Sequence, residues 1–135
     1  YPIGIEQTTG PYLVRDPMAV DGDALICVGE VPNGAVVQIL QGNKDGLVNA
    51  AGQVARTVIN GRLKERSSDP KTVFAWDCAS RRKYLLDDFQ EELDAISNEI
   101  PEQDQLIGAM TVAEVASTAN GTIRLLNKSL VMMCP

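Results

Sequence analysis

The sequence contains no histidine, and aromatic residues account for only 4% of its 135 positions. Histidine is the usual general base near neutral pH and the commonest metal-binding side chain in proteins. Its absence argues against most serine–histidine or cysteine–histidine catalysis, and it also argues against zinc sites. We therefore expect a protein that is not an enzyme, with no catalytic residue, no metal and no cofactor.

Cysteine is also scarce. The three cysteines, Cys27, Cys78 and Cys134, lie far apart and form no CxxC pair. An odd number of separated cysteines is poor support for a disulfide framework and fits a reducing compartment. Because Cys27 and Cys134 lie within short apolar runs, we expect them to be small buried side chains.

The sequence has few basic residues: it contains 12 basic and 18 acidic residues, which gives a net charge of −6. A negative domain repels phosphate backbones and anionic membrane surfaces. No apolar run approaches the roughly 18 residues that a membrane-spanning helix needs. We therefore expect a cytoplasmic protein with no nucleic-acid partner and no membrane partner.

What is present is the composition of a globular domain, with 44% hydrophobic and 22% charged residues. A chain of this length buries roughly two-thirds of its unfolded surface and can fold around one core. No linker or internal repeat divides the sequence, so we expect a single domain over residues 1–135. Because the sequence opens with Tyr1 rather than methionine, we expect this domain to be part of a longer protein.

The first forty residues carry strand and turn patterns. Asp16-Pro17 predicts a turn, and so does Asp21–Asp23. The apolar, β-branched segments 24–31 and 35–40 predict two strands. Since a tight-turn signal lies between these strands, we expect a β-hairpin over residues 24–40.

The period of the apolar residues then changes. From Leu47 to Val58 they recur at spacings of four, three and four, which predicts an amphipathic helix of about five turns. Asn43 or Asp45 is the expected N-cap. Gly52 within this helix predicts close packing on a sheet.

A second amphipathic helix is predicted from Leu85 to Ile100, and Pro101 ends it. Its acidic residues are expected on the solvated face: Asp87, Asp88, Glu91, Glu92, Asp94 and Glu99.

Further strands are predicted at 72–76, 105–111 and 130–134. Connections are expected at 67–70, 78–83 and 119–121. The order β-β-α-β-α-β-β predicts the α+β class, with a mostly antiparallel sheet and two main helices packed on it.

Three segments lie in an order that is typical of one known family. Val73–Arg81 is a strand ending in cysteine, followed by a short polar step and arginine. Ile107–Val115 is a strand followed by a glutamate, and Asn127–Met132 is an asparagine followed by an apolar strand. In these segments the chain resembles the C-terminal half of the FIST sensory domain, over nearly its whole length. Ala79-Ser80 and Ala113 depart from the glycines common in that family.

The resemblance implies a sensor of small ligands within a signal transduction protein, and amino acids are the suggested ligand class. It also implies two partners, the N-terminal FIST half and a signalling output domain, and a homo-oligomer is a further expectation. The matched positions make five residues candidates for ligand binding: Cys78, Ser80, Arg81, Glu114 and Asn127.

Arg81 is expected where a strand leads into a helix, and a guanidinium group there can bind a ligand carboxylate with two hydrogen bonds. Arg82 and Lys83 add positive charge beside it. The alternative is a solvent-exposed arginine that pairs with acids of the following helix, at positions 87, 88 or 91.

The other candidates also carry alternatives. Cys78 is a ligand-contacting or redox-responsive thiol, or else a packed structural residue. Glu114, in an apolar run, either faces solvent or is held for a cation. Asn127 either binds ligand or braces a turn. Together, Arg81 for a carboxylate and Glu114 for an ammonium group would suit an α-amino acid.

Three functions stay open at this point. A ligand-binding sensory module is favoured, and the alternative is a structural or dimerisation module that docks neighbouring domains. An enzyme that uses Cys78 or a carboxylate is least favoured, because no spacing of base, nucleophile and orienting group is visible.

Overall fold

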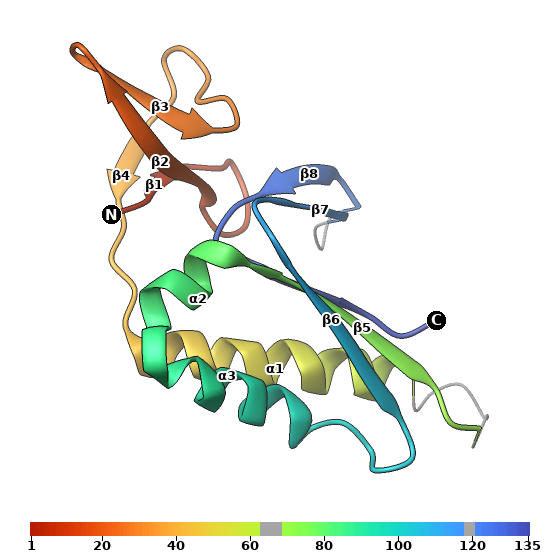
Figure 1. The fold of residues 1–135 in the computed structure, drawn as a ribbon. Helices are drawn as coiled ribbons and strands as arrows, with labels where there is room; N and C mark the ends of the chain where they lie inside the picture. The colour runs from red at the N-terminus through yellow and green to blue at the C-terminus, as the bar shows by residue number, and fades with distance from the viewer. Residues whose placement is uncertain (63–68, 118–120) are drawn as a thin grey trace.

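The computed structural model describes residues 1–62, 69–117 and 121–135 (Figure 1). Their strands are β1 (Ile3–Ile5), β2 (Leu13–Asp21), β3 (Ala24–Val28), β4 (Val37–Ile39), β5 (Thr72–Cys78), β6 (Gln105–Thr111), β7 (Glu114–Ser117), β8 (Ile123–Leu126) and β9 (Leu130–Met133). Their helices are α1 (Lys44–Arg62), α2 (Ala79–Leu85), the 3-10 helix η1 (Leu86–Asp88) and α3 (Phe89–Ser97). The connections predicted at 67–70 and 119–121 lie partly outside the described residues.

The strands form two sheets and a ribbon. One sheet has the order β3-β2-β1-β4, the other has the order β6-β5-β9, and β7 pairs with β8. Within the described ranges, every strand pairing is antiparallel except that of β5 with β6, which is parallel. Helices combined with mostly antiparallel strands confirm the predicted α+β class.

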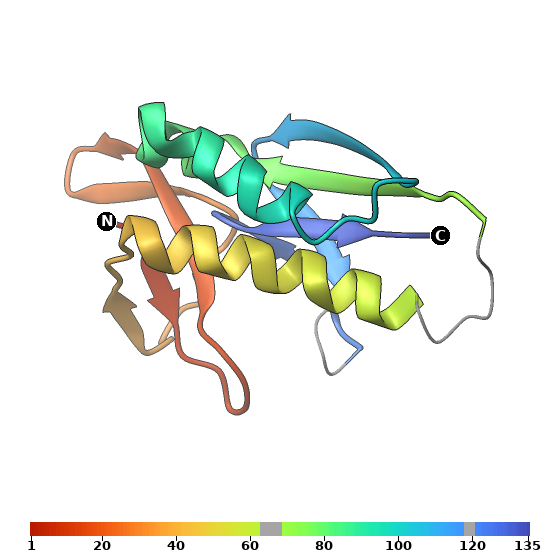
Figure 2. The same ribbon diagram turned by 90° about the horizontal axis from the view of Figure 1, so that it is seen from below.

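Helices α1 and α3 lie side by side against one face of the three-stranded sheet (Figures 1 and 2). Ala51 and Ala55 of α1 pack with Ile96 of α3 at the centre of the core. A Cβ added at Gly52 would lie 3.4 Å from the carbonyl oxygen of Ala95, so small residues let the two helices approach closely. The prediction that Gly52 packs on a sheet is therefore wrong, because its neighbour is α3.

The start of α1 confirms one of the two predicted caps. Asn43 Oδ1 accepts a hydrogen bond of 2.7 Å from the Gly46 N–H, which satisfies a donor that has no partner within the helix. Asp45 lies in the first turn, where its charge favours the helix dipole.

The hairpin predicted over 24–40 is wrong. Strand β3 pairs with β2 across a turn at Gly22, whose φ is +56°, whereas β4 pairs with β1. The turn predicted at Asp16-Pro17 is also wrong, because β2 continues through Pro17. A register shift between Pro17 and Ala19 accommodates the proline, which has no N–H to give to a regular ladder.

The second predicted helix is broken into parts. Helix α2 ends at Leu85, and Leu86, the first residue of η1, takes a left-handed φ of +52° before α3 follows. A positive φ is uncommon for a residue other than glycine. The residue type at position 86 therefore gives no sign of the break, and the apolar periodicity continues across it. The connection predicted at 78–83 is wrong as well, since α2 begins at Ala79.

Candidate functional site

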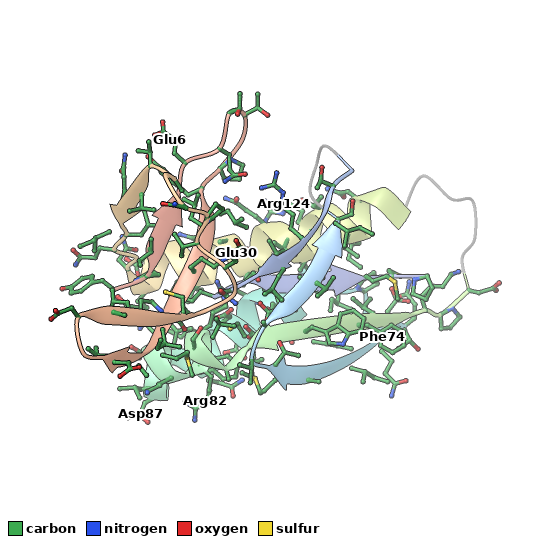
Figure 3. All side chains as sticks on the ribbon, turned by 90° about the horizontal axis from the view of Figure 1, so that it is seen from above. Glu6, Glu30, Phe74, Arg82, Asp87 and Arg124 are labelled. Atoms are coloured by element: carbon green, nitrogen blue, oxygen red, sulfur yellow. The ribbon has the colours of Figure 1, made fainter. Side chains whose placement is uncertain are left out.

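Strand β5 sorts its side chains onto two faces. Ala75 and Asp77 are buried, and both lie in a groove that α3 also lines. Phe74 and Trp76 alternate with them and stack on each other, with ring centroids 6.0 Å apart. Figure 3 shows Phe74 on the face of the strand turned away from the helices. Because side chains alternate along a strand, the carboxylate of Asp77 lies on the face of β5 that the helices cover.

Arg81 is the centre of a buried charge cluster. Its Nε and Nη2 both donate to Glu92 Oε1, at 2.8 and 2.5 Å. Nη2 also donates to the Leu47 carbonyl at 3.1 Å, and Nη1 donates to the Lys128 carbonyl at 3.5 Å. Asp77 Oδ1 lies 3.3 Å from Nε. One guanidinium group thus ties α2 to α1, α3, β5 and the segment before β9.

Two sequence expectations about this cluster are wrong. Glu92 was expected on a solvated helix face, yet it is fully buried at 0% exposure. Arg81 is also buried, so the alternative of an exposed arginine paired with nearby acids does not hold. Two of those acids, Asp88 and Glu91, instead pair with Lys44 at 3.2 and 2.6 Å.

Asp77 is the member of the cluster that sequence reasoning missed. Its residue is 6% exposed, and neither carboxylate oxygen has a hydrogen-bond partner among the described residues. Burial and the neighbouring Glu92 carboxylate raise the pKa of Asp77 to about 7, although Arg81 acts in the opposite direction. The available signal was its alternation with the apolar residues Val73 and Ala75 in β5.

Cys78 is buried at the end of β5, with 1% of its surface exposed. Its Sγ lies 3.1 Å from Ser80 Oγ and donates to the Val112 carbonyl at 3.6 Å. The contacts hold the thiol between the start of α2 and the segment that follows β6. The expectation that Cys27 and Cys134 are buried is wrong, because both are only partly covered.

Glu114 lies at the start of β7 and is buried, so the solvent-facing alternative is wrong. Its Oε1 lies 2.6 Å from the Thr111 hydroxyl, and its Oε2 accepts a hydrogen bond of 2.6 Å from the Ser129 hydroxyl. The same Ser129 accepts a hydrogen bond from the Cys78 N–H through its carbonyl, at 3.1 Å. Glu114 therefore holds the segment before β9 against the end of β6.

Asn127 connects the four-stranded sheet to the segment between β8 and β9. Its Oδ1 accepts a hydrogen bond from the Asp16 N–H at 3.3 Å, and its Nδ2 donates to the Leu126 carbonyl at 3.0 Å. The next residue, Lys128, has a φ of +55° and places its Nζ 3.0 Å from Asp16 Oδ1. These contacts fix β2 against the end of β8.

A cavity of about 570 Å³ opens between the N-terminal sheet, the start of α1 and the start of α2. It is lined by Tyr1, Pro2, Val14, Leu40, Gln41, Gly42, Leu47, Ser80, Arg81, Tyr84 and Lys128. Two of the five predicted site residues, Ser80 and Arg81, line it, whereas Cys78, Glu114 and Asn127 do not. Arg81 and Glu114 therefore do not share this cavity.

Arg82, the next basic residue of the predicted cluster, contacts other groups. The Arg82 guanidinium lies over the Phe89 ring, 5.2 Å from its centroid, and donates to the Leu86 carbonyl at 2.7 Å. Figure 3 shows Arg82 and Asp87 together at the outer corner of the molecule. Arg82 therefore braces the break between α2 and α3 and does not line the cavity.

Comparison with known families gives a clear result, because the FIST C domain matches residues 1–117. The match covers most of the chain, so the chain belongs to the FIST C domain family and the resemblance seen in its motifs is confirmed. This is a family of sensory domains rather than of enzymes, which is consistent with a role in signal transduction. No curated protein and no solved structure matches the chain.

Two further observations concern the described residues only. They contain no group of three or more cysteine, aspartate or glutamate side chains placed to hold a metal ion. None of their helices is both long enough and apolar enough to cross a membrane.

Proposed function

We propose that this domain is a cytoplasmic sensor that binds a small ligand, an amino acid being the class expected from its family. The observation that supports the proposal best is the 570 Å³ cavity lined by Ser80 and Arg81. Its volume lies within the range of about 300–1,000 Å³ that is usual for small-molecule sites. Its lining combines apolar side chains with a few polar groups, as such sites generally do.

Arg81 is the group proposed to bind a ligand carboxylate. A guanidinium group has five N–H donors. Of the four hydrogen bonds described above, three use the Nε and Nη2 donors, whereas Nη1 makes only the long contact to Lys128. Nη1 therefore has room for a further acceptor, and Glu92 keeps the opposite edge of the group in place.

The other predicted site residues are proposed to position this site. Cys78 and Glu114 fix the segment before β9, from which Lys128 reaches the cavity. Asn127 holds the same segment against β2. For an amino-acid ligand, the side-chain carbonyl of Gln41 is one acceptor among the lining residues that suits an ammonium group.

The location of the cavity supports a way to transmit a signal. Its lining comes from the start of the chain, from the connection between β4 and α1, and from the β5–α2 corner. A ligand that contacts all three parts stabilises the arrangement in which they are close together. The signalling output domain expected as a partner would then respond to this arrangement.

Thermal unfolding with a panel of amino acids tests the proposal. A ligand present at ten to a hundred times its dissociation constant should raise stability by about 1–3 kcal/mol. Gly42→Leu should abolish the shift, because an added Cβ at this lining residue meets nothing within 4 Å and so extends into open space. Gly61→Leu is the matched control, since Gly61 is equally open and lies outside the cavity.

Arg81→Lys tests the carboxylate contact, with the exposed Arg82→Lys as its control. The first variant should weaken binding of amino acids more than binding of their decarboxylated amines, whereas the second should leave both unchanged. If no amino acid shifts the unfolding temperature of the wild-type chain, the amino-acid proposal is wrong.

A second candidate function is docking of the N-terminal FIST half expected as a partner. Exposed apolar side chains on β2 and β3 favour it, since Val20 and Leu25 are 71% and 56% exposed and lie opposite each other in the register. Contiguous exposed apolar surface often marks an interaction site. Light scattering of Val20→Asp and Leu25→Asp variants, with and without the N-terminal half, separates docking from self-association.

A further inference from the structure

A second cavity of about 300 Å³ lies on the other side of the β5–α2 corner, between α3 and the face of β5 and β6. The parallel register places Ala75 beside Gly108, and Asp77 beside Met110. A Cβ added at Gly108 would lie 3.4 Å from the Ala75 carbonyl, so the missing side chain leaves the groove open above Ala75. Most of the remaining lining is apolar, including Phe89 and Leu106.

Asp77 is the single charged residue among the described residues that line this groove. Its buried carboxylate oxygens accept no hydrogen bond from the described residues. A neighbouring donor, the Cys78 N–H, gives its hydrogen bond to the Ser129 carbonyl. Arg81 donates Nε to Glu92 and approaches Asp77 only as an ion pair at 3.3 Å. The cluster therefore holds two carboxylates for one guanidinium group.

We propose that this groove binds a small apolar amine, with its ammonium group on the Asp77 carboxylate and its alkyl group on the apolar walls. An ammonium group supplies three N–H donors and the positive charge that the cluster lacks. A buried carboxylate without a hydrogen-bonded partner is unfavourable, so a cation that reaches it gains strongly. The lining offers no cation for a ligand carboxylate, which separates this ligand class from amino acids.

A proton competes with the amine for Asp77. The charged groups that face this carboxyl are Arg81 from α2, Glu92 from α3 and Glu114 from β7. Because burial and Glu92 raise the pKa of Asp77 to about 7, the carboxyl is largely protonated at pH 6 and largely ionised at pH 8. Amine affinity should therefore rise by about tenfold between these pH values.

The experiment uses isobutylamine as the probe and isobutanol as its neutral equivalent in shape, with backbone NMR of the full chain at pH 8. Isobutylamine should shift the amide signals of Gly108 and Met110, with at least tenfold tighter binding than isobutanol. Asp77→Asn keeps the shape of the side chain and should remove this preference. Equal binding of the two probes, or an unchanged preference in Asp77→Asn, would overturn the proposal.

A second pair of variants tests the location. Gly108→Val fills the groove and should abolish amine binding, whereas Ile107→Val lies on the opposite face of the same strand and should not change it. Amine binding that survives Gly108→Val places the site elsewhere and contradicts the proposal. Because Gly42 lines the larger cavity and not this groove, Gly42→Leu should leave amine binding intact, so the two ligand proposals succeed or fail separately.

Discussion

The buried cluster around Arg81 and the exposed ion pairs of α1 lie on neighbouring helices, yet their charges are arranged differently. Arg56 meets Glu99 with two hydrogen bonds, of 2.5 and 3.1 Å, and the Arg56 side chain is 63% exposed. This bonding lowers the pKa of Glu99 and raises that of Arg56. In the buried cluster, Arg81 donates two hydrogen bonds to Glu92, and the Asp77 carboxylate has no hydrogen bond from the described residues.

The two regions differ in their access to water. Water can solvate the charged groups of the exposed pairs when a partner is lost, but it cannot solvate the buried carboxylate. Exposed ion pairs contribute little, because solvent and salt screen them. A buried carboxylate that lacks a partner raises the free energy of the folded state until a proton or another cation reaches it. Among the described residues, we therefore expect pH to act most strongly at this buried cluster.

Breaking the buried pair should have the largest effect. Glu92→Gln removes the carboxylate that Arg81 binds at 2.5 and 2.8 Å, and it should reduce the free energy of unfolding by about 3–5 kcal/mol. Chemical denaturation measures this loss. A loss of the size seen for exposed pairs would show that Asp77 replaces Glu92 fully.

Asp77→Asn should act in the opposite direction. Since the pKa of Asp77 is raised from 3.8 to about 7, the folded state holds a proton that the unfolded state has lost between these pH values. Wild-type stability therefore falls as the pH rises from about 4 to 7 and stays low above it. Asp77→Asn should remove most of this slope and be more stable than wild type by about 2–4 kcal/mol at pH 8. Denaturation curves at pH 5 and pH 8 measure both effects.

Asn127→Ala should have a smaller effect. It removes the hydrogen bonds to the Asp16 N–H and the Leu126 carbonyl, which predicts a loss of about 1 kcal/mol. Hydrogen exchange should show faster exchange in β2 than in β5. Uniform acceleration in both strands would mean that Asn127 does not specifically hold β2 against the end of β8.

Arg56→Gln should have the smallest effect of the four. The Arg56–Glu99 pair is exposed, so its loss should change stability only slightly and not at all in 1 M salt. Thermal unfolding at low and high salt provides the check. A large loss that persists in salt would remove the contrast between exposed and buried pairs.

Much of the fold could be predicted from local patterns. The period of apolar residues located α1, and Asn43 was one of its two predicted caps. The hairpin failed because β1 pairs with both β2 and β4, and such distant pairing leaves no local signal. The break at Leu86 depends on a backbone conformation that its residue type does not favour.

The candidate site could be predicted in part. Arg81 was located at the end of a strand, but its partner was not, since acids near it were assigned together to the solvated face. Glu92 lies three residues after Phe89 and four before Ile96, which places it on their side of α3. Alternation in β5 likewise marked Asp77 as an inward residue. The sequence therefore contained a signal for each of the two acids. Only the structure shows that both Glu92 and Asp77 lie against the guanidinium group of Arg81.

The most direct test of this contrast is a carbon-detected NMR titration of the carboxyl groups of Asp77 and Glu99. A partnerless buried carboxyl predicts a midpoint near pH 7 for Asp77, while Arg56 keeps the midpoint of Glu99 below its ordinary value. A midpoint for Asp77 near its ordinary value of 3.8 would show that Arg81 already balances both acids. That result would contradict the uncompensated charge in the cluster.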